Sequence, residues 1–490
     1  MRKTVVINTL GCSKNRVDSE RLARQIVAAG FAVFHDSSLA AVDKADILIL
    51  NTCGFIKDAK KESIEAIFSA VEAKKRGAIG KLLVFGCLSQ RYAQLLATEI
   101  PEVDAFLGAN NLASVLGALG QEWRPGLATE RDLSTPPHYA YLKISEGCDR
   151  SCAYCAIPLI RGPHTSTPVE TLVQEAEHLA AKGVKELLIV AQDTTYYGLD
   201  LNKERLLAPL MERLAKVDGI EWIRLHYAYP AGFPRDVLEL MANHPKVCPY
   251  IDIPLQHISD KVLSAMRRSI DEVQTRRLIE EIRTLVPNVC LRTTMMVGHP
   301  REDKRAFEQL LHFVAEARFE RLGAFTYSEE EGTYGAQNYK DTISEKIKSE
   351  RYQRLMELQS SISLAYNQSR VGKKERVLID AAEGATLVGR TRFESPEVDG
   401  ALYIDIASAS DASLSTASGA SLSAASGASL STASGASLST ASGASLSTAS
   451  GASLPTASDV AARLVGTFQE VTIQRAGDYD LFGVLYSPRI

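Results

Sequence analysis

Three cysteines, Cys148, Cys152 and Cys155, lie within eight residues of one another in the stretch SEGCDRSCAYCAIP. Their C-x3-C-x2-C spacing differs from the C-x2-C pairs of zinc ribbons and fingers. Three close thiolates suit a 4Fe–4S cluster in which each cysteine binds one iron. The fourth iron is then free to bind a small molecule, as a catalytic metal keeps one open position. A zinc site completed by His164 is the alternative.

A second trio of cysteines lies near the start of the chain. Cys12 ends TVVINTLGC, Cys53 ends ILILNTC and Cys87 ends KLLVFGC, so each stands just past an apolar run that predicts a parallel strand. In open α/β sheets ligands bind at the C-terminal edge of the strands, so we expect the three thiols to converge there. Cys248 and Cys290 lie in or near apolar strands and are interpreted as packing residues.

These apolar runs belong to an alternation of strands and helices over residues 1–120. Helical spacing occurs at 18–29 and 58–76, between the runs TVVINTL, ILILNT and KLLVFG. Continuous apolar strands that alternate with helices indicate a parallel sheet covered on its faces, here a doubly wound α/β domain. Residues 121–137 are rich in Pro and Gly and are interpreted as a linker.

A longer alternation fills residues 138–368. Helical patterns occur at 169–182 and 272–285, and a closing helix is expected at 344–368. Strands are predicted at 141–145, 186–192, 222–227, 250–255, 290–297 and 323–327. Six such units favour a complete or partial β/α barrel, with an open doubly wound sheet as the alternative. The cysteine triplet follows the first of these strands, at the end of a barrel that carries chemistry.

Residues 369–490 change character to short strands parted by Gly, Pro and Asp, which predicts a small antiparallel β-barrel. A low-complexity insertion at 407–459 interrupts it, with six copies of an ASLSTASG-like octapeptide from Ala412 to Asp459. One Leu per eight residues buries little apolar area, so we expect a disordered or loosely ordered surface loop. A β-solenoid is the less favoured alternative.

The composition is that of an ordinary globular protein, with 45% hydrophobic and 23% charged residues and a net charge of −4. The chain as a whole carries no basic field, so tight nucleic-acid binding is not expected. No secretory signal and no run of roughly 18 apolar residues is seen, so no membrane association is expected. We interpret the protein as cytoplasmic, where eight cysteines indicate metal binding or catalysis rather than disulfides.

The triplet spacing resembles the signature of radical S-adenosylmethionine enzymes. Together with the second trio and the terminal small barrel, it resembles the methylthiotransferases, which combine a cluster domain, a radical S-adenosylmethionine core and a TRAM domain. Several stretches look like the RimO branch, which modifies ribosomal protein S twelve. They are GCSKNRVDSE, NTCGFI, YLKISEGCDRSC, AQDTTYYG, IPLQHISDKVLSAMRR and GRTRFESPEVDG.

The resemblance implies two 4Fe–4S clusters and S-adenosylmethionine as both radical source and methyl donor. The resemblance also implies that Cys148, Cys152 and Cys155 hold the cluster that makes a 5′-deoxyadenosyl radical. Cys12, Cys53 and Cys87 hold an auxiliary cluster that presents sulfur. The implied reaction replaces a β-C–H bond of an aspartate with a methylthio group, and an electron donor is required.

Three further residues are candidates for cofactor contact. Tyr154 occupies the aromatic position that the superfamily places near the adenine. Gln192 and Asp193 follow a predicted strand at the active end of the barrel, although loop capping explains them equally well. The chain has Thr167 where the family commonly has Arg, and Arg301 where it tends to have Gly. Both departures put local substrate or cofactor contacts in question.

The cysteines do not decide between a protein and an RNA substrate. Methylthiolation of an adenosine in tRNA would use the same ligands, and a cluster-bearing scaffold or redox sensor is a third reading. From Val371 to Ile490 there are eight Lys or Arg against twelve Asp or Glu. An RNA-binding barrel should be basic, whereas an acidic one suits a basic ribosomal protein on or near the small subunit.

Overall fold

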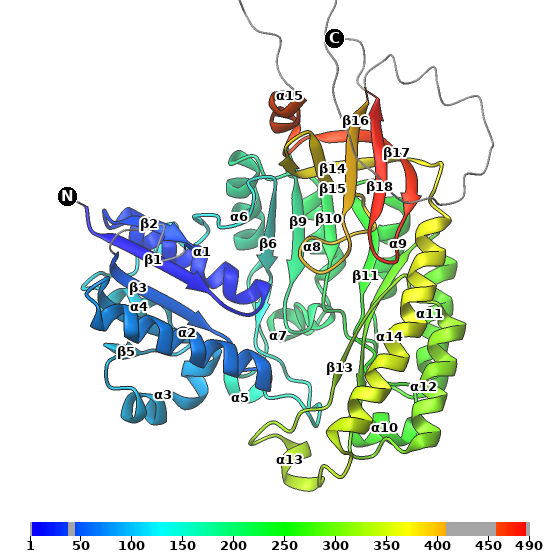
Figure 1. Ribbon diagram of the computed structural model, residues 1–490, viewed down its shortest axis with the longest axis horizontal. Coiled ribbons are helices and arrows are strands. Elements are labelled where there is room, and N and C mark those ends of the chain that lie inside the picture. Colours follow the sequence, from blue (N-terminus) through cyan, green and yellow to red (C-terminus); the bar gives the residue numbers. More distant parts are fainter. Residues whose placement is uncertain (1, 38–44, 408–456, 487–490) are drawn as a thin grey trace, which may run out of the picture.

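The computed structural model describes residues 2–37, 45–407 and 457–486. They form an N-terminal α/β unit, a central β/α unit and a small β-barrel close to the C-terminus (Figure 1). The octapeptide array lies almost wholly outside these residues. No helix in the described ranges is both long and apolar enough to cross a membrane.

The N-terminal unit contains a five-stranded, fully parallel sheet in the order β2-β1-β3-β4-β5. Its strands are β1 (Thr4–Thr9), β2 (Ala32–His35), β3 (Ala45–Thr52), β4 (Ile79–Gly86) and β5 (Ala105–Phe106). Helices α1 (Ser13–Ala28) and α4 (Leu112–Ala118) pack on one face, and α2 (Lys57–Lys75) and α3 (Cys87–Glu99) pack on the other. This is the predicted doubly wound domain, and its topological switch point lies between β1 and β3.

The central unit contains a six-stranded parallel sheet whose spatial order follows the chain, β6-β9-β10-β11-β12-β13. Its strands are β6 (Tyr139–Lys143), β9 (Glu186–Val190), β10 (Trp222–Leu225), β11 (Val247–Asp252), β12 (Cys290–Val297) and β13 (Arg321–Thr326). The two edge strands do not pair with each other. A doubly wound sheet would reverse its order, so the structure is the partial barrel of the two predicted alternatives.

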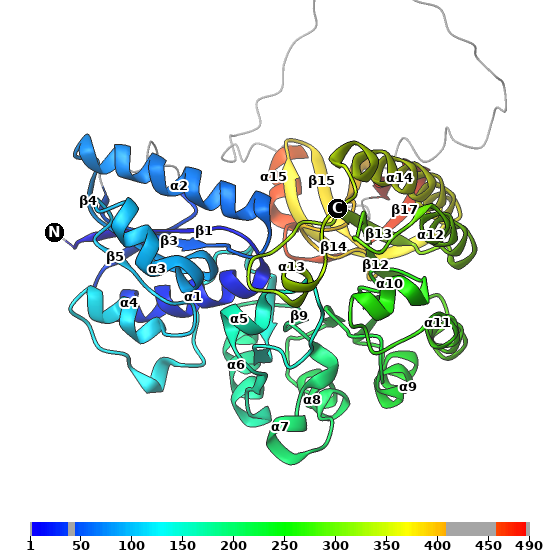
Figure 2. The same cartoon turned by 90° about the horizontal axis from the view of Figure 1, so that it is seen from below.

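Helices surround the outside of this partial barrel, as Figure 2 shows from the end view. They are α6 (Val169–Ala181), α8 (Leu207–Ala215), α9 (Arg235–Asn243), α11 (Glu272–Leu285), α12 (Lys304–Ala317) and α14 (Glu345–Gln368). The shorter elements are β7 (Ser145–Glu146), α5 (Ile157–Arg161), β8 (Thr165–Ser166), α7 (Leu199–Asn202), α10 (Asp260–Ala265) and α13 (Tyr334–Asn338). The main apolar core lies between these outer helices and the sheet.

The C-terminal unit is a closed five-stranded barrel in the order β14-β15-β16-β18-β17. Its elements are β14 (Lys374–Glu383), β15 (Thr386–Arg390), β16 (Leu402–Ala407), α15 (Ala457–Leu464), β17 (Phe468–Ala476) and β18 (Leu481–Tyr486). All strand pairs are antiparallel, as predicted, except β16 with β18, which run parallel. The parallel pair is possible because α15 and β17 stand between β16 and β18 in the chain, which is more than the dozen or so residues that a crossover needs.

The loop that joins β15 to β16 fills the N-terminal end of the central barrel. Its buried Glu394 binds Arg321 of β13 and Arg370, which follows α14. Ser395 Oγ lies 2.9 Å from His226 Nε2, and Asp399 accepts from the Tyr250 hydroxyl at 2.7 Å. The small barrel thereby closes one end of the central barrel and leaves the opposite end for the cysteines.

Candidate active site

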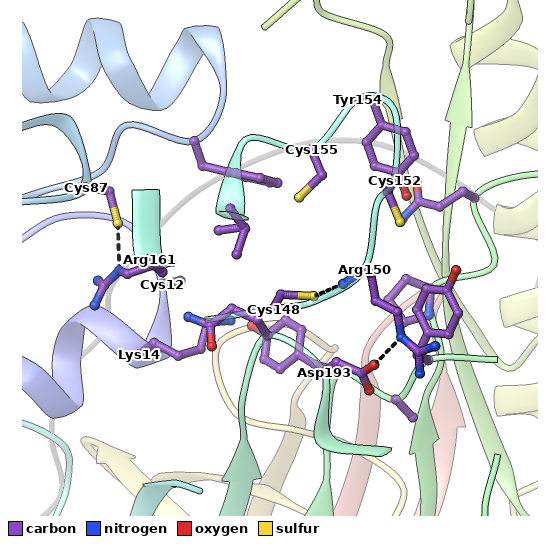
Figure 3. A pocket seen from close by; sticks show the side chains of 18 of the residues that line it. Cys12, Lys14, Cys87, Cys148, Arg150, Cys152, Tyr154, Cys155, Arg161 and Asp193 are labelled. Carbon is purple, nitrogen blue, oxygen red and sulfur yellow. Dashed lines mark hydrogen bonds and ion pairs between the residues drawn. The ribbon is translucent and has the colours of Figure 1, made fainter. Parts of the chain in front are cut away.

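All six cysteines of the two predicted trios line one cavity of about 310 Å³. The cavity lies where the C-terminal edge of the N-terminal sheet meets the C-terminal end of the central barrel. Figure 3 shows Cys12 and Cys87 on one side of it and the triplet on the other. The C-terminal strand ends of the sheet and of the barrel, where ligands bind in such folds, therefore face the same cavity.

The N-terminal trio follows three neighbouring strands. Cys12 comes after β1 at the N-cap position of α1, Cys53 follows β3 directly, and Cys87 is the first residue of α3, directly after β4. Because β1, β3 and β4 pair in parallel, their ends meet at one edge. Gly11 has φ +92°, and a Cβ there would lie 2.7 Å from Cys53 Cβ, so only glycine allows this close approach.

The triplet lies on the loop between the short strand β7 and helix α5. The Cys155 amide donates to the Cys152 carbonyl at 3.1 Å, and the Ala153 amide donates to the Met266 carbonyl at 2.8 Å. The Arg150 amide donates to Cys148 Sγ at 3.4 Å. These bonds hold the loop before any ligand binds.

A buried polar network joins the two halves of the site. Arg161, the last residue of α5, donates to Cys87 Sγ at 3.3 Å and to Asn15 Oδ1 at 2.7 Å. The same guanidinium binds Asp18 at 2.9 Å and Glu146 at 3.1 Å. This arginine from the central unit therefore fixes groups on α1 and α3 of the N-terminal unit.

The three predicted cofactor-contact residues, Tyr154, Gln192 and Asp193, also line the cavity. Gln192 Nε2 donates to Glu146 at 2.7 Å. Asp193 caps the 3-10 turn Thr194–Tyr196 through one carboxylate oxygen and binds Arg150 Nε at 2.8 Å through the other. Asp193 is therefore a capping residue that also lines the cavity, and its contact with a cofactor stays a prediction.

Several lining residues escaped the sequence analysis. They are Lys14, Arg150, Arg161, Tyr227, Tyr229, Gln256 and Arg268. Tyr227 and Gln256 come shortly after the ends of strands β10 and β11. This position at a strand end could have identified them as candidate site residues. Both adopt left-handed backbone conformations, with φ 55° and 73°, which are uncommon for non-glycine residues. Lys14 and Arg150 each stand two residues after a cysteine in the sequence, whereas Arg161 and Arg268 are brought to the cavity by the fold.

The cavity chemistry fits thiolate-bound clusters and a polar small molecule. Burial raises the pKa of Cys53 and Cys155 to about 12 and that of Cys148 to about 11, so free thiols stay protonated and iron must displace their protons. Lys14, Arg150, Arg161 and Arg268 offset the negative charge that thiolates bring. Gln192 Oε1 and Gln256 Oε1 are buried and have no hydrogen-bond partner within the described ranges, which leaves acceptors for a ligand.

The zinc alternative is not favoured by this geometry. His164 does not line the cavity, and its Nε2 lies 3.1 Å from Ser166 Oγ. Without His164, the three cysteines of the triplet are one short of the four ligands of a structural zinc site.

The remaining singled-out residues lie away from the cavity. Cys248 and Cys290 pack with Trp222 and Tyr250 in an apolar cluster, as predicted. Thr167 donates its amide to the Ile144 carbonyl and does not line the cavity. Arg301 is exposed beside the Tyr339 ring. Neither departure from the family pattern therefore contacts the cavity.

Three family models match successive parts of the chain. Residues 4–108 match the uncharacterized protein family UPF0004, residues 142–314 match the radical SAM superfamily, and residues 371–426 match the TRAM domain.

Curated relatives are similar over nearly their whole length. The chain is 53% identical over 398 residues to the ribosomal protein uS12 methylthiotransferase RimO of Bacteroides fragilis, covering 81% of this chain and 91% of the relative. It is 52% identical over 410 residues to the RimO protein of Porphyromonas gingivalis, covering 84% and 94%.

A solved structure shares the fold at low identity. The radical S-adenosylmethionine methyltransferase TsrM from Kitasatospora setae, with tryptophan and a SAM analogue bound, aligns with a TM-score of 0.50 and 13% identity. The alignment covers 78% of this chain and 79% of that one.

Proposed function

Because this chain belongs to the RimO family of ribosomal protein uS12 methylthiotransferases, we propose that it transfers a methylthio group to the β-carbon of an aspartate of uS12. The observation that carries the proposal is the shared cavity lined by two separate cysteine trios. A β-C–H bond is barely acidic, so radical chemistry at this cavity suits the reaction better than a general base.

We assign Cys148, Cys152 and Cys155 to one 4Fe–4S cluster and Cys12, Cys53 and Cys87 to a second. When bound, the first cluster with S-adenosylmethionine supplies a hydrogen-abstracting radical, and the second supplies the sulfur that a second S-adenosylmethionine methylates. With three thiols each, both clusters keep one iron free of protein ligands. An electron donor of the cell is also required.

The protein's own side chains bind, orient and shield the reactants. Gln192 and Gln256 offer unpartnered carbonyl oxygens to a polar cofactor. Tyr154 packs beside Met266 and Tyr327 and presents an aromatic wall for an adenine base. Arg150 and Arg268 lie over the Tyr229 ring at 4.0 and 4.2 Å, and this stack walls the cavity against water.

The sequence charge supports the protein substrate over tRNA. The residues from Val371 onward carry eight basic against twelve acidic side chains, which suits a basic ribosomal protein. We infer that the reaction takes place in the cytoplasm, on or near the small ribosomal subunit, because uS12 is the proposed substrate.

Mass spectrometry of uS12 and of bulk tRNA from cells with and without the gene tests the proposal. We expect the methylthio mass to disappear from uS12 alone. Loss from tRNA alone would replace the proposal with the adenosine reaction. Reconstituted protein that releases no 5′-deoxyadenosine from S-adenosylmethionine under reductant would indicate a non-catalytic scaffold or sensor.

A further inference from the structure

Four cationic side chains line the cavity, and three of them have partners. Arg161 is bound to Asp18 and Glu146, and Arg150 is bound to Asp193. Arg268 donates to Cys152 Sγ at 3.6 Å and to the Pro254 carbonyl at 2.5 Å. These three cations therefore stabilise the loop that carries the triplet and the interface between the N-terminal and central units.

Lys14 differs from the other three. It is buried in the cavity wall, and its Nζ forms no ion pair with a carboxylate in the described part of the chain. The ammonium instead lies 3.4 Å from the centre of the Tyr227 ring. Unlike Arg150 and Arg161, Lys14 forms no ion pair with a carboxylate in the described ranges, so its ammonium is available to an anionic group that enters the cavity.

The position of Lys14 is between the two cysteine groups. It lies two residues after Cys12, near the start of α1, and its side chain reaches across to Tyr227 at the end of β10. Figure 3 shows it at the cavity wall between Cys12 and Cys148. Tyr227 is itself fixed, because its amide donates to Asp252 Oδ2 at 3.2 Å. The ammonium is thus held at a defined place beside the space where substrate must enter.

We propose that Lys14 is a specificity-determining residue that binds the side-chain carboxylate of the target aspartate. The inference rests on the proposed function and deepens it. The aspartate β-carbon is bonded directly to that carboxylate, so an ion pair with Nζ fixes the reacting carbon within the cavity between the two trios. Positioning of this kind lowers the entropic part of a reaction barrier.

The same contact explains discrimination between substrates. An adenine base carries no negative charge and an asparagine side chain is neutral, so neither can form an ion pair with the Lys14 ammonium. Leaving one member of a buried charge pair without its partner costs enough to weaken binding about 30-fold or more. Lys14 therefore selects an acidic side chain.

The test compares binding of two ligands to cluster-loaded enzyme. One is purified uS12, and the other is uS12 with Asn at the aspartate that the wild-type enzyme modifies. We expect wild-type protein to bind the Asp form about 30-fold more tightly or better, and Lys14→Met to bind both forms equally. Lys14→Arg should keep most of the preference, because it keeps the charge. Lys61→Gln on the exposed face of α2 is the matched control and should behave as wild type.

A Lys14→Met protein that still prefers the Asp form by the wild-type ratio would overturn the inference. If Lys14→Met loses iron, the Lys14→Arg variant becomes the test. An iron-replete Lys14→Arg protein without any preference for the Asp form would also overturn the inference. Failure of the proposed function looks different, because wild-type protein would then leave uS12 unmodified. Wild-type protein that modifies uS12 but binds both forms equally would overturn the inference alone.

Discussion

The Nε of Arg161 donates a hydrogen bond to Sγ of Cys87 at 3.3 Å. Arg161 lies six residues after the last cysteine of the triplet, whereas Cys87 belongs to the other trio, in the N-terminal unit. The side chain that follows one predicted cluster thus contacts a predicted ligand of the other. Because of this contact, the geometry of the site depends on how the N-terminal and central units are placed relative to each other.

Replacement of Arg161 by Met should weaken the protein at this interface. Asp18 and Glu146 would lose a buried partner, and breaking a buried ion pair costs about 3 kcal/mol. We expect a correspondingly lower denaturation midpoint and less iron retained. Arg213→Met is the control, because that arginine is exposed and pairs with an exposed Glu170, so its midpoint should hardly move. Equal stability of the two variants would contradict the role of Arg161.

Substitution of single cysteines should distinguish the functions of the two trios. Cys148→Ala should lose about half of the roughly eight irons per chain and all release of 5′-deoxyadenosine. Cys53→Ala should also lose about half of the iron, yet still release 5′-deoxyadenosine while transferring no methylthio group. Cys248→Ala, in the apolar cluster, is the control and should keep its iron. An iron content near four in the wild type would contradict the N-terminal cluster.

Glu394 should stabilise the contact between the small barrel and the central barrel in a pH-dependent way. Burial alone would raise its pKa, but Arg370 and Arg321 outweigh burial and hold the pKa of Glu394 well below its ordinary value. Its contribution is therefore fully present above about pH 4.3, the pKa of an unfolded glutamate, and is lost as the pH falls toward the folded pKa.

Glu394→Gln should accordingly lower the free energy of unfolding by about 3 kcal/mol at neutral pH. The difference from wild type should shrink as the pH falls below about 4.3. Denaturation midpoints measured from pH 7 downward test this. Glu308→Gln, an exposed residue paired with Arg354, should change the midpoint little at any pH. A Glu394→Gln difference that grows in acid would refute the argument.

Removal of residues 412–451, five complete octapeptides, should leave iron content and methylthio transfer largely intact. The reason is compositional, since one Leu per eight residues offers little apolar area to a core. The deletion keeps the five barrel strands and α15, whose Ala461 and Leu464 pack in the barrel core. Loss of soluble, iron-bearing protein would show instead that the array is structural.

Local patterns predicted much of this molecule. Strand β12 and helix α11 occur at their predicted bounds, because apolar periodicity and the Asp271 capping box act within a few residues. Helix α1, by contrast, begins at Ser13 rather than near residue 18. Its polar first turn is buried against the central unit, including Asn15 and Asp18, and so lacks the apolar spacing of a surface helix.

The sequence by itself determined the two sets of cysteines and their places at strand ends, since spacing and strand periodicity are local properties of the chain. Only the tertiary structure decided that both sets face one cavity, that Arg161 links them, and that Lys14 stands there without a carboxylate partner in the described ranges. Those facts depend on contacts between residues far apart in the chain, and their geometry is set by packing of whole units rather than by any local pattern.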